Sequence, residues 1–287
     1  MSMKTLNLIG AGRVGQTLAH LWHTRQVFRV QQVLTRSATS AQGACQFIGT
    51  GAPATALHAM APAEIWMLAV PDAAIAQAAA DLAAHARDTQ LAPAVVFHCS
   101  GALTAAHMAP LAELGWQVAS AHCILSFATA AGAVQQFPGT ACALEGDAQA
   151  CTLLHAAFSD IGAHCFAVAS EDKVLYHAAA VFATNFLPVL QTLAERAWQA
   201  TGVPDALIPS LRASLLANAV ANINRLGPQA ALTGPAARGD VAAIARQADV
   251  VRQWDPQAGA AYEALSALAL RMANASKDTT ATAATTR

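Results

Sequence analysis

A glycine-rich turn near the start of the chain constrains the fold more than any other feature. Residues 4–9 form a short, mostly apolar run, and the sequence Gly10-Ala-Gly12-Arg-Val-Gly15 follows at once. This order predicts a buried strand, a tight turn and a helix that reaches about residue 26. The first glycine permits the turn, the second lets a phosphate approach the backbone, and the third lets the helix lie close to the strand.

This context predicts a dinucleotide site with the pyrophosphate at the N-terminus of the helix, where free N–H groups and the helix dipole favour anions. The alternative is an ordinary strand-to-helix turn that contains three glycines. The predicted cofactor-binding residues of the turn are Gly10, Gly12, Arg13, Val14 and Gly15.

Apolar runs alternate with helical patterns as far as residue 170. The predicted strands are 4–9, 31–35, 64–70, 94–99, 117–121, 140–144 and 164–169, and helices are predicted at 73–86 and 147–161. This alternation is typical of parallel strand–helix–strand units in a doubly wound, Rossmann-type α/β sheet.

Beyond Ser170 the pattern is helical only, over 171–200 with a bend at Pro188, then over 205–226 and 239–273. The sequence therefore predicts a dinucleotide-binding domain at 1–170 and an all-helical domain for substrate binding and dimerisation at 171–273. A tail at 274–287, rich in Thr, Ala and Ser, is expected to fray.

The end of the second predicted strand distinguishes between the two nicotinamide dinucleotides. NAD sites usually place Asp or Glu there to hold the ribose hydroxyls, but this chain has Thr35-Arg36-Ser37 and no carboxylate before Glu64. Arg36 can pair with a 2′-phosphate, and the two hydroxyls can donate hydrogen bonds to it. The pattern favours NADP(H), with a solvated loop arginine as the alternative.

Two later strands are expected to end at the same crevice, because parallel strands present their carboxyl ends at one edge of the sheet. Val70 and Pro71 follow one strand and are predicted to contact the cofactor. Ser100 follows the other, where it can bond the nicotinamide amide or take part in catalysis; the alternative is a simple turn serine.

Composition excludes several classes of function. A net charge of −1 gives no reason to expect a nucleic-acid partner. The six cysteines include no C-x-x-C pair, which favours reduced thiols in a cytoplasmic protein and predicts no metal site. No run of about 20 residues is free of polar interruptions, so no membrane span is expected.

Two segments of the helical region carry a family resemblance. Lys173-Val-Leu-Tyr-His177-Ala-Ala-Ala-Val-Phe-Ala-Thr-Asn185 and Ala231-Leu-Thr-Gly-Pro-Ala-Ala-Arg-Gly-Asp240 resemble the bacterial Rossmann-like and DUF2520 domain-containing proteins. The N-terminal half is similar to the β-hydroxyacid dehydrogenase and pyrroline-carboxylate reductase group. The resemblance implies an NADP oxidoreductase whose helical domain is of the 6-phosphogluconate dehydrogenase C-terminal type and forms a homodimer. This chain departs from the family at one point, because Cys123 stands where a proline usually follows His122.

Lys173 and His177 are the predicted catalytic pair, with Ser100 as a third candidate. Residues four apart project from one helix face, and the resembling dehydrogenases carry Lys-x-x-x-Asn at this point. Transfer of a hydride from C–OH requires loss of the hydroxyl proton, which a buried lysine or a histidine near neutrality can accept. The alternative is a solvated lysine and a packed structural histidine.

Three further polar residues lie in the helical region. Asn185 can bond a distant part of the ligand or, more simply, satisfy a helix contact. Arg238 can clamp a substrate carboxylate or pair with Asp240, and Asp240 is expected to cap the helix that follows it.

These observations predict an NADP-dependent oxidoreductase acting on a small hydroxy, keto or imino acid. A protein of another class, an NADP(H)-binding sensor without turnover, would need the same glycine turn. The enzyme and the sensor differ in whether Lys173 and His177 line the nicotinamide end of the crevice.

The residues at the end of the second strand generate a first prediction. NADPH should bind at least about tenfold more tightly than NADH, or about 1.4 kcal/mol, and Arg36→Ala should remove most of that difference. Fluorescence energy transfer from protein to cofactor measures both affinities. Equal affinities of the wild-type protein for the two cofactors would contradict the prediction.

Overall fold

The computed structural model describes the backbone of residues 3–285 and the side chains of residues 3–275. The chain forms two compact units, Met1–Asn185 and Phe186–Arg287. The sequence predicts a boundary near residue 170, where the strands end, whereas the first helix after the sheet packs within the first unit. Its first residue, Lys173, is completely buried.

The first unit is built on an eight-stranded sheet in the order β3-β2-β1-β4-β5-β6-β7-β8. The strands are β1 (Lys4–Ile9), β2 (Phe28–Leu34), β3 (Ala52–Ala54), β4 (Ile65–Leu68), β5 (Val95–His98), β6 (Gln117–Cys123), β7 (Ala141–Gly146) and β8 (His164–Ala167). The doubly wound sheet is as predicted, with two differences. β3 has only three residues and too little apolar periodicity to be recognised, and β7 runs antiparallel to β6, so the sheet is not wholly parallel.

The register of four neighbouring strands fixes where the loops meet. Ile9 pairs with Leu68, Leu68 with His98, and His98 with Ser120. The carboxyl ends of β1, β4 and β5 therefore lie in one row beside β6, and the segments that leave them converge at one edge of the sheet.

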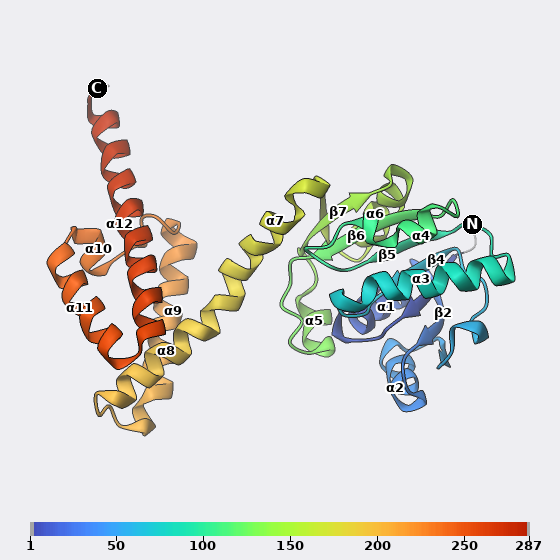
Figure 1. Cartoon of the computed structure of the whole chain (residues 1–287), viewed down its shortest axis with the longest axis horizontal. Coiled ribbons are helices and arrows are strands. Elements are labelled where there is room, and N and C mark those ends of the chain that lie inside the picture. The colour runs from blue at the N-terminus through green and yellow to red at the C-terminus, as the bar shows by residue number, and fades with distance from the viewer. Residues whose placement is uncertain (1–2, 286–287) are drawn as a thin grey trace. The chain divides into compact units, whose positions relative to one another are not determined.

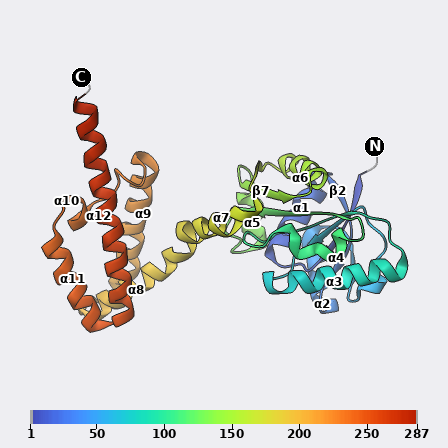
Figure 2. The ribbon, with the colours of Figure 1, turned by 45° about the horizontal axis from the view of Figure 1, so that its top comes forward.

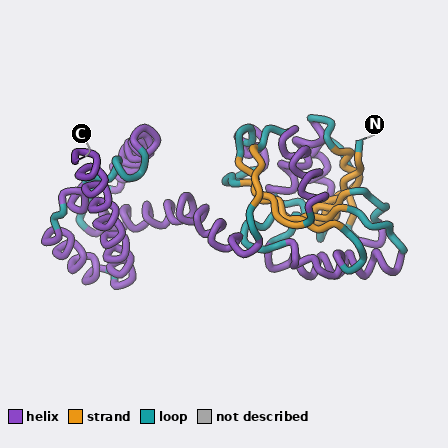
Figure 3. The backbone as a smooth tube through the Cα atoms, turned by 90° about the horizontal axis from the view of Figure 1, so that it is seen from above, coloured by secondary structure: helices purple, strands orange, loops and turns teal. Residues whose placement is uncertain are grey.

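Helices cover both faces of the sheet (Figure 3). On one face α1 (Arg13–Thr24), α2 (Ala38–Ile48) and α6 (Ala148–Asp160) pack around the fully buried Trp22, whose indole N–H donates to the Ala157 carbonyl at 2.9 Å. On the other face α3 (Asp72–Thr89) and α4 (Ala109–Ala112) cover a second apolar cluster around Trp66. A short helix, α5 (Ala130–Gln136), lies against α1.

A helical stretch begins at the end of the sheet. A single 3₁₀ turn (Ser170–Asp172) leads into α7 (Lys173–Ala180), which continues through a π-helical segment (Val181–Asn185) into α8 (Phe186–Ala200). This π-helical segment lies just before Pro188, where the sequence predicts a bend. Proline has no N–H to donate to the carbonyl four residues back, and its ring crowds that carbonyl, so the hydrogen-bond pattern shifts there.

The second unit contains α8, α9 (Ile208–Leu226), α10 (Gly234–Arg238), α11 (Val241–Trp254) and α12 (Pro256–Thr285). The described part of this unit contains helices and no strand, as predicted. α11 and α12 pack side by side in Figures 1 and 2, and the break between them is fixed by Asp255, whose carboxylate accepts from the amides of Gln257 and Ala258. α10 lies between the predicted helices 205–226 and 239–273 and was not itself predicted.

The predicted frayed tail at 274–287 falls largely outside the residues whose side chains are described, and α12 itself runs to Thr285. Two helical stretches, Ser170–Ala200 and Asp205–Leu226, are long and apolar enough to cross a membrane by length and composition alone, each with an 18-residue window of mean hydropathy 1.3. The sequence pattern predicts no membrane span, because polar residues interrupt both stretches. Two such helices are weak evidence for a membrane span.

Candidate functional site

The glycine turn after β1 has the geometry that a nucleotide phosphate requires. Gly10 has φ +85°, and a Cβ there would lie 2.6 Å from the Ala69 carbonyl oxygen after β4. A Cβ on Gly15 would lie 2.9 Å from the Ala69 Cβ, so both positions need glycine for packing. A Cβ on Gly12 would meet no protein atom within 4 Å. The second glycine is therefore open on the side that a ligand would approach.

The N-terminus of α1 is free to bind an anion. Gly12 is the N-cap and supplies no capping side chain, and the first turn carries no acidic residue. The first bond within the helix runs from the Gln16 amide to the Gly12 carbonyl at 3.0 Å, which leaves the preceding first-turn amides without a helical partner. Arg13 donates to the Ala128 carbonyl at 3.2 Å and so ties the turn to the segment after β6. These groups fit a pyrophosphate.

The segment after β2 presents one available cation. Ser37 caps α2, accepting from the Ser40 amide at 3.2 Å, and Thr35 donates to the Ser37 carbonyl at 2.8 Å. Arg36 is exposed and makes no hydrogen bond or ion pair with the described part of the chain. Arg36 can therefore reach a phosphate without breaking a contact, whereas the two hydroxyls would have to exchange partners. Their roles in cofactor binding stay predictions.

Ser100 joins the segments after β4 and β5. Its hydroxyl donates to Asp72 Oδ2 at 2.7 Å and accepts from the amides of Ala102 and Leu103 at 3.3 and 3.0 Å. Asp72 begins α3 directly after Pro71, the N-cap of that helix. The Ser100 hydroxyl is thus fully engaged in fixing this corner, and a direct contact with cofactor or substrate stays a prediction. The sequence analysis did not single out Asp72.

Lys173 reaches into the sheet from the first turn of α7. Its ammonium donates to Ser120 Oγ at 2.7 Å and to the Ser100 carbonyl at 3.3 Å, and Ser120 also donates to that carbonyl at 3.1 Å. Burial lowers the pKa of Lys173, and the carboxylates of Glu145 and Asp72 partly oppose this shift. The lysine is therefore the buried group that the sequence predicted, and it bonds β6 and the segment after β5 rather than open solvent.

A buried carboxylate anchors the entry to α7. Glu145 on β7 accepts from the Ala105 amide at 2.9 Å and from the Ser170 hydroxyl at 2.7 Å. The second bond fixes the backbone just before Lys173. No sequence motif marks Glu145, since its two partners lie far away along the chain.

His177, one turn beyond Lys173, lies against Gly101 and His122. A Cβ on Gly101 would overlap His177 Nδ1 and would lie 2.9 Å from His122 Nε2. The two imidazole rings contact edge to face with centroids 5.4 Å apart. His177 Nδ1 is a buried atom with no hydrogen-bond partner in the described part of the chain. The structure thus brings Lys173, His177 and Ser100 to the same strand ends.

His122 enters this cluster although it is not among the predicted site residues. Its Nδ1 lies 2.8 Å from the Tyr176 hydroxyl. Burial, with a contribution from neighbouring His177 and Lys173, lowers the pKa of His122 to about 4. Burial also raises the pKa of Tyr176. The sequence feature that indicates this cluster is the spacing of Lys173, Tyr176 and His177, which places all three on one helix face.

The remaining predicted residues lie apart from this cluster. Asn185 is exposed and accepts from Thr184 Oγ1 at 2.8 Å. Asp240 accepts from the Ala243 amide at 3.0 Å, which confirms it as the cap of α11. Arg238 is exposed and forms no ion pair with Asp240 among the described residues. Substrate binding by Asn185 and Arg238 stays a prediction.

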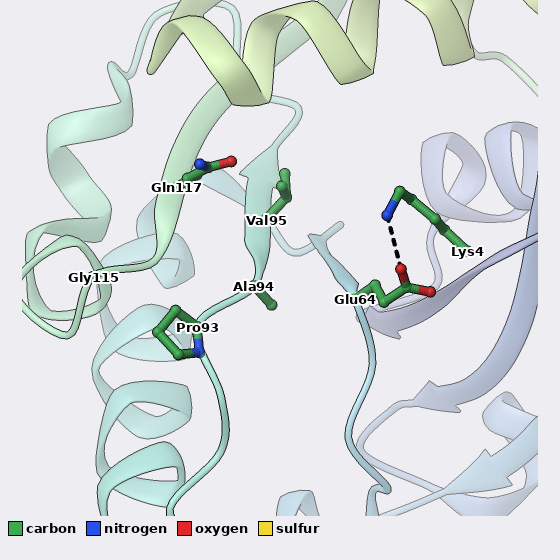
Figure 4. A pocket seen from close by; sticks show the side chains of 7 residues that line it. All are labelled: Lys4, Glu64, Pro93, Ala94, Val95, Gly115 and Gln117. Atoms are coloured by element: carbon green, nitrogen blue, oxygen red, sulfur yellow. Dashed lines mark hydrogen bonds and ion pairs between the residues drawn. The ribbon is translucent and has the colours of Figure 1, made fainter.

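A pocket of about 270 Å³ lies at the opposite edge of the sheet (Figure 4). Its polar lining includes Lys4 and Glu64, which form an exposed ion pair at 2.8 Å, and Gln117 at the start of β6. Because these residues stand at the amino ends of their strands, the pocket is not part of the site at the carboxyl ends.

The sheet and the open glycine turn define a Rossmann-type protein with a helical second unit. Family models agree with this assignment: a Rossmann-like domain matches residues 2–122, and the domain of unknown function DUF2520 matches residues 140–269. The chain belongs to the Rossmann-like and DUF2520 domain-containing proteins. No curated protein matches the sequence.

Solved structures share the fold over almost the whole chain. Protein TM1727 from Thermotoga maritima has a TM-score of 0.74 at 25% identity, covering 95% of this chain and 99% of its own. BF3122 from Bacteroides fragilis, provisionally described as an NADP oxidoreductase, has a TM-score of 0.72 at 23% identity and covers 94% and 99%. Pyrroline carboxylate reductase from Plasmodium falciparum with NADP bound has a TM-score of 0.56 at 12% identity and covers 95% and 99%.

The three glycines generate a second prediction. In Gly12→Ala the new Cβ meets no protein atom, so the melting temperature should change little while the NADPH affinity falls at least about tenfold, or about 1.4 kcal/mol. In Gly10→Ala the methyl group meets the Ala69 carbonyl at a positive φ, so stability should fall as well. Cofactor titration and thermal unfolding of both variants separate the two effects. Unchanged NADPH affinity in a folded Gly12→Ala protein would exclude a phosphate at this turn.

Proposed function

We propose that the protein is an NADP-dependent oxidoreductase acting on a small hydroxy, keto or imino acid. The observation that carries the proposal is the row of strand ends, which gathers an open phosphate-binding turn and a cluster of buried polar side chains at one edge of the sheet. The similarity of the fold to BF3122 and to pyrroline carboxylate reductase, whose names state an NADP oxidoreductase and an NADP complex, supports it.

The residues present fit NADP(H). The turn from Gly10 to Gly15 and the free amides of α1 would hold the pyrophosphate, and the exposed Arg36 would hold the 2′-phosphate. Val70 and Pro71, which lie between β4 and α3, would border the nicotinamide half. The bound cofactor supplies the hydride; the protein must supply a place for the substrate and a path for the proton.

Lys173 and His177 are proposed for proton handling. Burial lowers the pKa of Lys173, which makes its ammonium a better proton donor than that of an exposed lysine, and its bond to Ser120 would let it act through that hydroxyl. His177 has an unpartnered nitrogen beside Gly101. Ser100 would hold both the Asp72 corner and the Lys173 ammonium in place, and Arg238 and Asn185 remain candidates for binding the rest of the substrate.

We also propose that the helical unit forms a homodimer. Large apolar side chains are exposed along α8 and α9, among them Val189, Leu190, Leu215, Val220 and Ile223. Exposed apolar surface of this extent favours association. Light scattering after size exclusion should give a mass near twice 29.5 kDa without detergent. A monomeric mass, or a requirement for detergent, would contradict the dimer. A cytoplasmic location stays a prediction.

Loss of either proposed proton carrier should affect turnover without affecting cofactor binding. Lys173→Ala and His177→Ala should lower turnover by about 10²–10⁴-fold on whichever keto, hydroxy or imino acid a substrate screen identifies. NADPH affinity should be close to that of the wild-type protein, because neither residue is placed at the adenine half. Because Lys173 is buried, Lys173→Met provides a variant of similar volume. Normal turnover in folded variants of both residues would remove them from the mechanism and favour a sensor.

A further inference from the structure

We propose that His122 Nε2 donates a hydrogen bond to the carbonyl oxygen of the substrate, and that Tyr176 positions His122 for this role. The proposal rests on the proposed function and narrows the substrate class to keto and hydroxy acids rather than imino acids. His122 is the catalytic residue in this inference, and Tyr176 acts through it.

The alternation of side chains along β6 and the spacing of side chains along α7 bring these residues together. Residues two apart on a strand share a face, so Ser120 and His122 both face α7. Residues three apart on a helix are neighbours, so Lys173 and Tyr176 lie on one side of α7. Lys173 bonds Ser120 at 2.7 Å, and Tyr176 lies 2.8 Å from His122 Nδ1. The bond between Lys173 and Ser120 therefore fixes the position from which Tyr176 reaches His122.

In the proposed arrangement the Tyr176 hydroxyl donates to His122 Nδ1, which corresponds to one tautomer of His122. Burial raises the pKa of Tyr176, so the phenol keeps its proton and can donate it to His122 Nδ1. The pKa of His122 is lowered to about 4, so the ring is neutral near pH 7. A neutral imidazole that accepts at one nitrogen carries its proton on the other. Nε2–H is then the donor.

His122 Nε2 has no hydrogen-bond partner among the described residues, and unlike His177 Nδ1 it is not fully enclosed by them. In the proposed complex the substrate oxygen would accept from this nitrogen. The ring is held from two sides by edge-to-face contacts, with centroids 5.5 Å from Tyr176 and 5.4 Å from His177. Gly101 leaves room for both imidazoles, since a Cβ there would lie 2.9 Å from His122 Nε2.

The donor character of Nε2 limits the substrate. A carbonyl oxygen has lone pairs to accept the bond, and it gains negative charge when the carbonyl carbon is reduced, so the bond strengthens during the reaction. A protonated imine has no lone pair on nitrogen and would meet an opposing N–H. His122 keeps its own proton in this role; the proton that completes the alcohol comes from the proton carrier proposed above.

Nitrogen-15 NMR of the cofactor-free protein tests the tautomer. The expected spectrum shows His122 neutral, with the proton on Nε2 and an unprotonated, hydrogen-bonded Nδ1, and Tyr176→Phe should abolish this preference. The exposed His58 is a control whose tautomers should not respond to Tyr176→Phe. A His122 that carries its proton on Nδ1 would overturn the proposed donor.

Kinetics with NADPH and matched panels of 2-keto acids and cyclic imino acids tests the substrate class. Turnover should occur with keto acids, and His122→Ala should lower it by about 10²–10³-fold. His122→Gln should recover part of the loss, because its amide can place an N–H near Nε2, and His58→Ala should be normal. The inference is overturned if the protein turns over only imines, or neither panel. It is also overturned if His122→Ala turns over keto acids as well as the wild-type protein does.

The two proposals can fail separately. A wild-type protein that does not bind NADPH contradicts the proposed function, whatever the tautomer of His122. A protein that binds NADPH and reduces imines leaves the proposed function intact and removes only the inference about His122.

Discussion

The buried ammonium of Lys173 is the interaction on which the arrangement of the site depends. A charged or polar group out of water must find partners, since an unsatisfied one costs several kcal/mol. Lys173 finds them in Ser120 Oγ, in the middle of β6, and in the Ser100 carbonyl, which follows the adjacent strand β5. One side chain therefore joins the sheet to the first helix that follows it, and Glu145 secures the same junction through Ser170.

The position of α7 then determines which side chains meet. With Lys173 fixed, Tyr176 and His177 follow on the same side of the helix and lie over Gly101 and His122. Two imidazoles can pack there only because residue 101 has no Cβ. An alanine at that position would displace both rings without removing any functional group, so Gly101 is as important to the geometry as the histidines.

The sequence predicts the local parts of this arrangement and misses the long-range ones. The glycine turn, the strand ends and the face shared by Lys173 and His177 depend on residues close together in the chain, and their patterns are readable. Asp72, Ser120 and Glu145 acquire their roles from partners many residues away. The antiparallel β6–β7 pair and the three-residue β3 were missed because neither leaves a periodic signal of its own.

The hydrogen bonds that the protein makes with itself help to indicate where a ligand acts. Ser100, Ser120 and Glu145 have their partners within the fold, so their evident contribution is to hold the site rigid. Arg36, the Gly12 N–H and His122 Nε2 make no such bonds among the residues that the structure describes. Preorganised donors with no internal partner cost little to engage when a ligand arrives. In the proposed complex, Arg36 would bind the 2′-phosphate, the Gly12 amide the pyrophosphate, and His122 Nε2 the reacting oxygen.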